Sequence, residues 1–400
     1  MSLQLSAIAR QIQPSATLAA GAKAKQLRAQ GIQVFDFSLG EPDFPTPEHI
    51  CRAAVEAMNK GHTHYTPANG IPELRAAIAR SYERHYGLGY QPEEVIVSNG
   101  AKHAIYNVVA ALCGPGDEVL IPAPGWVSYF DIVQMTGAKP VWVPTSSEHG
   151  FKLTPQQLRS ALTPRSRLLL LNSPHNPTGS VYTPAELKAL AEVVLDSALL
   201  VLSDEIYERL TYDDYRATCF ATLGPELRQR TFTVSGVSKT YAMTGWRIGW
   251  ACGPVEAIRA MANIQSQQTG NPCSISQYAA LAALEGDQHC VEQIRQELAA
   301  RRELVCRRLQ AMPDVRLIPC QGAFFAFFDV SAYLGRRWNG QRVNNSAEFC
   351  VAALELAHIN LVPGSAFGIE GYVRLSFACP RSELEAGLDA LERFLKSSRS

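Results

Sequence analysis

The sequence predicts an α/β protein: a large domain with a mostly parallel sheet between helices, and a smaller α+β domain. Two observations predict this fold class. Short apolar runs rich in leucine, isoleucine and valine alternate with helical patterns over most of the chain, which is typical of a parallel sheet with helical crossovers. The chain has 400 residues, of which 46% are hydrophobic, so it can bury the cores of two domains.

Seven strands are expected in the large domain, which we place at residues 48–286. They cover residues 94–97, 118–121, 140–143, 168–171, 199–202, 231–234 and 247–251. Helical patterns fill the connections between them. In one connection, Thr183 followed by Pro184 and Glu186 predicts an N-cap, with proline in the first turn of a helix that ends at Leu195.

The pattern changes beyond residue 286, and we place the smaller domain at residues 287–400. A long charged helix is expected over residues 291–312, because opposite charges recur four positions apart. A strand hairpin over residues 316–330 and a final helix starting at Arg381 follow it. The polar stretch 335–345 has no periodicity, so we expect an irregular, mobile loop there.

The composition excludes several classes of function. Formal net charge is zero and the pI is about 7.1, so nothing favours a nucleic-acid or membrane-surface partner, and a small metabolite is the better expectation. The ten cysteines include no C-x-x-C pair, which argues against a zinc site and indicates a reducing compartment. The N-terminus is too polar for a signal peptide, and no apolar run approaches the roughly 18 residues of a membrane span. We therefore expect a cytoplasmic protein without a metal.

Lys239 is the most informative residue of the chain. It follows an expected strand in the run VSGVSKTYAMTGWRIGW and is the only lysine between Lys188 and Lys396. An amine at the end of a buried strand loses hydration, so its pKa falls and it becomes a nucleophile toward carbonyl groups. This is the chemistry of a lysine that forms a Schiff base.

Polar residues with suitable chemistry follow two other expected strands. Asn176 follows the run SRLLLL, and Asp204 and Tyr207 follow LLVLS; open parallel sheets bind ligands at these strand ends. A lysine imine with pyridoxal phosphate (PLP) needs an acid for the pyridine nitrogen and hydrogen bonds for the ring oxygen. On the residues alone, Asp204 serves equally well as a helix N-cap. Tyr207 also fits a core aromatic and Asn176 a plain turn.

Two features could receive the phosphate of this cofactor. Gly100, Ala101 and Lys102 follow an expected strand and open a helix, whose first N–H groups attract anions. The planar guanidinium of Arg247 could donate two parallel hydrogen bonds to the same group. The glycine turn alone is more often an ordinary connection between a strand and a helix.

Nine motifs in order make the sequence resemble the class I PLP-dependent aminotransferases of fold type I, within them the bacterial aspartate aminotransferase subgroup. The resemblance covers nearly the whole chain. Its motifs are PSATL at Pro14, FSLGEPDF at Phe37, HYTPANGIPELR at His64, SNGAKHAIYN at Ser98, APGWVSY at Ala123, NSPHNPTG at Asn172, SDEIYERL at Ser203, SKTYAMTGWRIGWACGP at Ser238 and GYVRLSFA at Gly371.

The resemblance implies an aspartate aminotransferase-like fold in which residues 1–47 join the smaller domain. It implies roles for the following residues: Lys239 binds PLP covalently, Asp204 faces the pyridine nitrogen, Tyr207 and Asn176 bind the ring oxygen, and Trp126 stacks on the ring. Ala101, Lys102 and Arg247 would bind the phosphate, and Tyr65 would reach the phosphate of the neighbouring subunit in a homodimer.

For the substrate, the resemblance implies that Arg374 binds the α-carboxylate, that Gly40 gives a backbone contact and that Lys102 reaches a distal carboxylate. Relatives often carry a serine at the position of Gly236, so the roles of Ser235 and Ser238 at the phosphate stay open. Two further positions depart from the pattern of these relatives: His103, where glutamine is common, and Gly125, where tyrosine is common. We expect both departures to reshape the pocket.

The predicted function is a ping-pong exchange of an amino group between aspartate or glutamate and a 2-oxo acid such as 2-oxoglutarate or oxaloacetate. An acceptor that is aromatic or resembles prephenate stays open, as does a lyase, decarboxylase or synthase of the same fold. A regulator that keeps this fold without catalysis would need a DNA-binding segment with a basic face. The first residues supply neither the length nor the charge for one.

Overall fold

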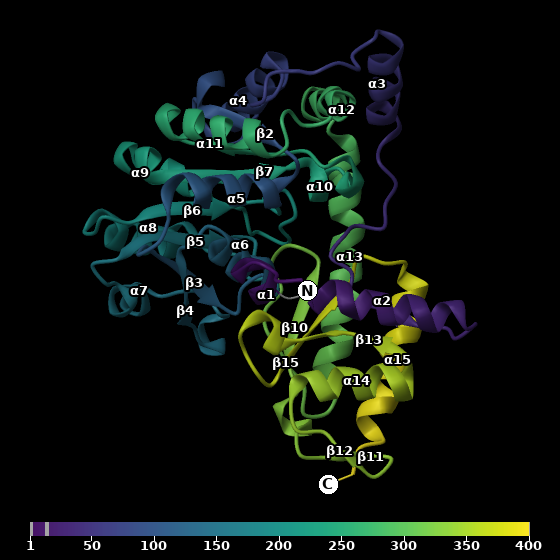
Figure 1. Cartoon of the computed structure of the whole chain (residues 1–400). Helices are drawn as coiled ribbons and strands as arrows, with labels where there is room; N and C mark the ends of the chain where they lie inside the picture. Colours follow the sequence, from purple (N-terminus) through teal and green to yellow (C-terminus); the bar gives the residue numbers. More distant parts are fainter. Residues whose placement is uncertain (1–2, 13–15, 400) are drawn as a thin grey trace.

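A seven-stranded sheet forms the larger part of the molecule in the computed structural model, which describes residues 3–12 and 16–399 (Figure 1). Its strand order is β2-β8-β7-β6-β5-β3-β4. The strands are β2 (Val95–Ser98), β3 (Glu118–Ala123), β4 (Lys139–Pro144), β5 (Ser166–Asn172), β6 (Leu200–Asp204), β7 (Thr231–Gly236) and β8 (Gly249–Cys252). β8 is antiparallel to both of its neighbours, β2 and β7, and the other strand pairs of this sheet are parallel. The α/β class and all seven expected strands are confirmed, with small shifts at their ends.

Helices cover both faces of this sheet (Figure 1). Leu168 and Leu170 of β5 pack in one cluster with α5 and α11, whereas Leu169 and Leu171 pack in another with α8, as the two-residue alternation of a strand requires. The helices of this part are α3 (Glu48–Asn59), α4 (Pro72–Tyr86), α5 (Ala101–Leu112), α6 (Val127–Met135), α7 (Pro155–Ala161), α8 (Pro184–Leu195), α9 (Pro225–Arg230), α10 (Val237–Thr240), α11 (Val255–Gln268) and α12 (Ser274–Glu285).

The N-cap expected at Thr183 is confirmed. Its hydroxyl accepts a hydrogen bond from the backbone N–H of Glu186, and the Glu186 carboxylate accepts one from the N–H of Thr183 at 2.8 Å. This reciprocal capping box satisfies donors that the first turn of α8 would otherwise leave unpaired.

A second, antiparallel sheet of order β14-β15-β10-β9 lies beside the long helix α13 (His289–Ala311). Its strands are β9 (Arg316–Leu317), β10 (Phe325–Asp329), β14 (Val362–Pro363) and β15 (Tyr372–Ser376), and α14 (Ser346–Ala357) and α15 (Arg381–Lys396) flank it. The expected long helix, hairpin and final helix are confirmed. Near the N-terminus lie α1 (Ala7–Gln11), α2 (Ala16–Ala29) and β1 (Phe35–Asp36), which pairs in parallel with β13 (Ile359–Asn360). The first two residues of the PSATL motif lie outside the described residues.

The stretch 335–345 differs from the sequence prediction. It forms a small hairpin of β11 (Arg337–Trp338) and β12 (Gln341–Arg342). The indole of Trp338 is buried, stacks on Phe394 with ring centroids 4.9 Å apart and donates to its carbonyl at 2.9 Å. The prediction of an irregular loop is wrong because one aromatic anchor fixes this polar stretch to α15.

Arg247 also differs, because it lies outside the strand expected at 247–251. It follows the short 3-10 turn η4 (Thr244–Trp246) in a left-handed conformation with φ 55°, and β8 begins two residues later. Beside it, Gly249 permits a close approach of β8 to the start of α5, since a Cβ there would lie 2.2 Å from the backbone nitrogen of Ala101.

Within the described ranges, no helix has both the length and the apolar character needed to cross a bilayer.

Candidate active site

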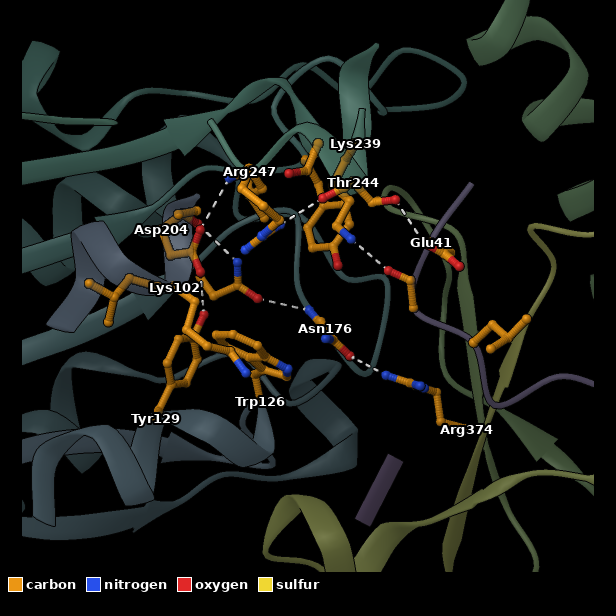
Figure 2. A pocket seen from close by; sticks show the side chains of 18 residues that line it. Glu41, Lys102, Trp126, Tyr129, Asn176, Asp204, Lys239, Thr244, Arg247 and Arg374 are labelled. Carbon is orange, nitrogen blue, oxygen red and sulfur yellow. Dashed lines mark hydrogen bonds between the residues drawn. The ribbon is translucent and has the colours of Figure 1, made fainter. Parts of the chain in front are cut away.

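A cavity of about 420 Å³ lies where β5, β6 and β7 end. Residues from both sheets and from the segment after β1 line it (Figure 2). They are Leu39, Gly40, Glu41, Ala101, Lys102, Ile105, Trp126, Tyr129, Asn172, Asn176, Asp204, Ile206, Tyr207, Ser238, Lys239, Thr244, Arg247 and Arg374. The structure therefore brings together every sequence-predicted site residue except Tyr65, which is 98% exposed and lies outside this cavity.

Lys239 lies on α10, directly after β7, with its side chain half-buried in the cavity. Its Nζ donates a hydrogen bond of 2.6 Å to the carbonyl of Gly40. Desolvation lowers the pKa of Lys239 to about 8, although the negative charge of Glu41 opposes that shift. Near neutral pH the uncharged, nucleophilic fraction of this amine is therefore larger than that of an ordinary lysine, although most of it stays protonated.

Asp204 is the last residue of β6 and is buried. Its carboxylate accepts hydrogen bonds from the Tyr129 hydroxyl at 2.6 Å and from the backbone N–H of Ile206 at 3.2 Å. Burial raises the pKa of Asp204 to about 6, and the hydrogen bond from Tyr129 holds it down. This carboxylate is therefore fixed in position, and a cation placed next to it would lower its pKa.

Asn172 and Asn176 connect Asp204 to the other side of the cavity. The Asn172 side chain donates to the Asp204 carbonyl at 2.9 Å and accepts from the backbone N–H of Asn176 at the same distance. Asn176 in turn accepts from an Nη of Arg374 through its Oδ1 at 3.0 Å (Figure 2). A continuous set of hydrogen bonds thus links Asp204 to Arg374.

Arg374 lies on β15 and is only 2% exposed. Its guanidinium donates to the Ser38 carbonyl at 2.7 Å and lies over the rings of Phe325 and Phe367 at 4.4 and 5.1 Å from their centroids. Burial lowers the pKa of Arg374 to about 10. Among the described residues no carboxylate forms an ion pair with it, and its Nε has no partner. A buried cation in this state is a site for an anion.

The start of α5 and Arg247 form a second cationic part of the cavity. Gly100 precedes α5 with φ 87°, and a Cβ there would lie 2.4 Å from an Nη of Arg247. Arg247 is exposed and donates to the Thr244 carbonyl at 2.8 Å. The first N–H groups of α5, at Ala101 and Lys102, have no partner within the helix, so they and this guanidinium can receive a phosphate-sized anion.

Trp126 and Lys102 lie against each other at the edge of the cavity (Figure 2). Lys102 Nζ lies 4.9 Å from the centroid of the Trp126 ring, an attractive cation–π distance. Trp126 packs edge-on against Tyr129, with ring centroids 5.2 Å apart. Desolvation and the charge of Arg247 lower the pKa of Lys102.

Tyr207 is buried among aromatic rings, with Phe324 and Phe325 at centroid distances of 5.5 and 5.8 Å. The two serines whose roles stayed open point in different directions. Ser238 lines the cavity, whereas the Ser235 hydroxyl donates to the Glu208 carboxylate at 2.6 Å.

His103 and Gly125 do not line the cavity. The His103 ring contacts Asn99 and Gln268 through hydrogen bonds of 3.3 and 3.2 Å. A Cβ on Gly125 would lie 2.9 Å from the Trp142 ring. Neither residue is among those that line the cavity, and their effect on its shape stays a prediction.

Sequence reasoning missed four residues with clear contacts in the site. Tyr129 and Asn172 bind Asp204, and Thr244 donates to the Glu41 carboxylate at 2.7 Å. All four lie inside the motifs given above: Tyr129 ends APGWVSY, Asn172 begins NSPHNPTG, Glu41 lies in FSLGEPDF and Thr244 in SKTYAMTGWRIGWACGP. The contact between Glu41 and Thr244 joins positions 203 apart in the chain, so no spacing indicates it.

Comparisons with known proteins agree with this geometry. A family model described as aminotransferase class I and II matches residues 32–391. An aspartate aminotransferase from Geobacillus stearothermophilus is 47% identical over 96% of this chain and 97% of its own. An aspartate/prephenate aminotransferase from Cereibacter sphaeroides is 46% identical over 96% of each chain.

Solved structures agree as well. The crystal structure of an aspartate aminotransferase from Rhizobium meliloti, 42% identical, superposes with a TM-score of 0.96 over the whole of both chains. A Thermus thermophilus aspartate aminotransferase with maleate, 40% identical, gives 0.92 over 98% of this chain and 100% of its own. The predicted family and its fold are thereby confirmed, and this chain belongs to the class I and II aminotransferases.

Proposed function

We propose that this aminotransferase uses PLP and exchanges the amino group of aspartate or glutamate with a 2-oxo acid. One observation carries the proposal: the Arg374 guanidinium, buried and without a carboxylate partner among the described residues, lines the same cavity as the Lys239 amine. A cation held next to a nucleophilic amine suits a substrate with both a carboxylate and an amino or keto group.

The residues of the cavity fit PLP. Lys239 supplies an amine for covalent attachment, and the buried Asp204 supplies an acid for the pyridine nitrogen. The space at Gly100, which a Cβ would fill, and the adjacent Arg247 suit the phosphate together with the N–H groups of Ala101 and Lys102. When bound, PLP would supply an electron sink that stabilises negative charge on the substrate α-carbon.

Other residues would position the ring. Trp126 offers an aromatic face, and Tyr207 and Asn176 offer hydrogen-bonding groups for the ring oxygen. The Lys239 amine, once free, is a base that can take a proton from the substrate α-carbon and return it nearby. The lowered pKa of Lys239, about 8, suits this task near neutral pH.

Arg374 would bind the α-carboxylate that all amino and 2-oxo acids share, and Gly40 would contribute a backbone contact. Lys102 would bind the distal carboxylate, since it is the other lysine that lines the cavity and no ion pair holds it within the described part of the chain. A prephenate or aromatic acceptor is the second candidate, favoured by the 46% identity to a relative named for prephenate.

We also propose that residues 1–47 and 287–400 form the smaller domain, that residues 48–286 form the larger one, and that the protein is a cytoplasmic homodimer. The pairing of β1 with β13 supports the division, and ten unpaired cysteines support a reducing compartment.

For the dimer, the 98% exposure of Tyr65 supports its reaching the partner's site. Sedimentation equilibrium tests the dimer; a monomer at micromolar concentration would disprove it.

The first prediction tests the reaction itself. Aspartate and glutamate, each incubated with 2-oxoglutarate, oxaloacetate, pyruvate or prephenate, should yield the corresponding aminated acceptor, measured by chromatography. Lys239→Ala should abolish transfer and also the covalent PLP adduct that borohydride traps, measured by mass spectrometry. Consumption of the donor with no aminated acceptor would instead identify a lyase or synthase.

The second prediction separates the two carboxylate sites. Arg374→Lys should lower kcat/KM about tenfold or more for every donor, because a hydrogen bond to a charged group contributes about 1.5–3 kcal/mol. Lys102→Ala should lower kcat/KM for aspartate and glutamate but not for phenylalanine. The exposed Arg216→Lys serves as the control. Equal losses for all donors in Lys102→Ala would show that Lys102 does not select the distal carboxylate.

The third prediction concerns pH. Neutral Lys239 is the reactive form, so the rate of covalent PLP attachment should rise with pH and level off above about 8. Glu41 holds the Lys239 pKa up, so Glu41→Gln should move the midpoint to lower pH, by up to about one unit. Glu355→Gln, on the exposed side of α14, is the control. A midpoint that stays in place or moves to higher pH would contradict this account.

A further inference from the structure

The segment 62–71, between α3 and α4, carries Tyr65 and is attached to the large domain by buried side chains. Tyr65 itself is 98% exposed and does not line the cavity of its own subunit. An exposed side chain on a loosely held segment would sample many positions, and ordering it on contact would cost free energy. A defined contact of Tyr65 with another molecule therefore requires that the segment be fixed beforehand.

Gln277 on α12 binds this segment next to Tyr65. Its side chain is fully buried. Its Nε2 donates to the Thr66 hydroxyl at 3.1 Å and to the Pro272 carbonyl at 2.9 Å, and its Oε1 accepts from the backbone N–H of Ile71 at 2.8 Å. Because Thr66 directly follows Tyr65 in the chain, the first of these hydrogen bonds reaches the residue beside the exposed ring.

Gln265 on α11 attaches the same segment to the seven-stranded sheet. It is fully buried. Its Nε2 donates to the carbonyls of Ala68 and Val97, and its Oε1 accepts from the Ser98 hydroxyl at 2.6 Å and from the Asn107 amide at 2.8 Å. All four hydrogen-bonding positions of this amide are thus occupied. The Ala68 carbonyl is therefore fixed relative to β2 and α5.

The two ends of the segment are held as well. At one end, the Ser274 hydroxyl donates to the His62 carbonyl at 2.8 Å. At the other, Gly70 has φ 98°, and a Cβ there would lie 2.7 Å from the Cβ of Val97, so the backbone packs directly on β2. Tyr65 thus extends into solvent from a segment that is attached on both sides of it.

We propose that Gln277 is a positioning residue that, through Thr66, holds Tyr65 where its hydroxyl meets the phosphate in the partner subunit's cavity. This role rests on the proposed PLP-dependent homodimer. Gln277 does not line the cavity of its own subunit, so it acts through the segment 62–71. A hydrogen bond to a phosphate oxygen weakens steeply with distance and angle, so a small shift of the segment is enough to lose it.

The experiment removes the contact nearest to Tyr65 with little change in shape. Thr66→Val deletes the hydroxyl that accepts from Gln277, at a partly exposed position. It should weaken PLP binding by the full chain about threefold to tenfold, the effect of one lost hydrogen bond. The measurement is a titration with PLP that follows the visible absorbance of the bound cofactor. Gln277→Met should weaken binding at least as much, and sedimentation should show the parent's dimer for both variants.

The matched control is Thr136→Val. The Thr136 hydroxyl donates to a carbonyl at the end of α6, at 2.8 Å, and is also partly buried. Thr136→Val should therefore bind PLP as the parent chain does. Parent-like binding in Thr66→Val and Gln277→Met, or dissociation of either variant into monomers, would overturn the positioning role.

A double-mutant cycle shows whether the contact acts through Tyr65. Tyr65→Phe should itself weaken PLP binding. Thr66→Val added to Tyr65→Phe should cause no further loss, because the hydroxyl that it positions is already absent. A merely structural role of Thr66 would instead cost the same in both backgrounds, and that result would overturn the proposal.

The cycle also separates this inference from the proposed function. A parent chain that is monomeric or does not bind PLP refutes the proposed function and the positioning role with it. Parent-like binding in Tyr65→Phe refutes the contact across the dimer, and again the positioning role with it. A loss in Tyr65→Phe with none in Thr66→Val or Gln277→Met refutes the role of Gln277 alone and leaves the proposed function intact.

Discussion

The pocket depends on one cation that the protein buries without neutralising. Desolvation of a guanidinium costs several kcal/mol unless a partner compensates it. Here the partners of Arg374 are a carbonyl at Ser38, an amide oxygen at Asn176 and two aromatic faces, all uncharged. They orient the guanidinium without neutralising its charge. An anionic ligand would therefore complete the contacts of Arg374.

The same cation organises the rest of the site. From Arg374 the hydrogen bonds continue through Asn176 and Asn172 to the main chain of Asp204, and Tyr129 fixes the Asp204 carboxylate from the other side. Each of these residues comes from a different strand end, turn or helix. The proposed anion site and the proposed acid therefore belong to one rigid network, and a shift at Asn176 would be felt at both.

The sequence predicts the fold and most of the site for a physical reason. Parallel strands bring their carboxyl ends to one edge, so polar residues after apolar runs, such as Asp204 and Lys239, had to converge. Single side chains that override a local pattern could not be predicted. Trp338 anchors a polar stretch to α15. Arg247 has a left-handed backbone conformation at the position where a strand was expected to begin.

The two lysines of the cavity are held in different ways, and this bears on which acids fit. Lys239 is hydrogen-bonded to a fixed carbonyl at Gly40, whereas Lys102 rests on the face of Trp126. A cation–π contact contributes about 0.5–2 kcal/mol, which is comparable to a single exposed ion pair. Lys102 can leave Trp126 for a carboxylate or stay on it beside an uncharged side chain at similar cost. A movable cation opposite the fixed one at Arg374 would give the enzyme breadth in the acceptor.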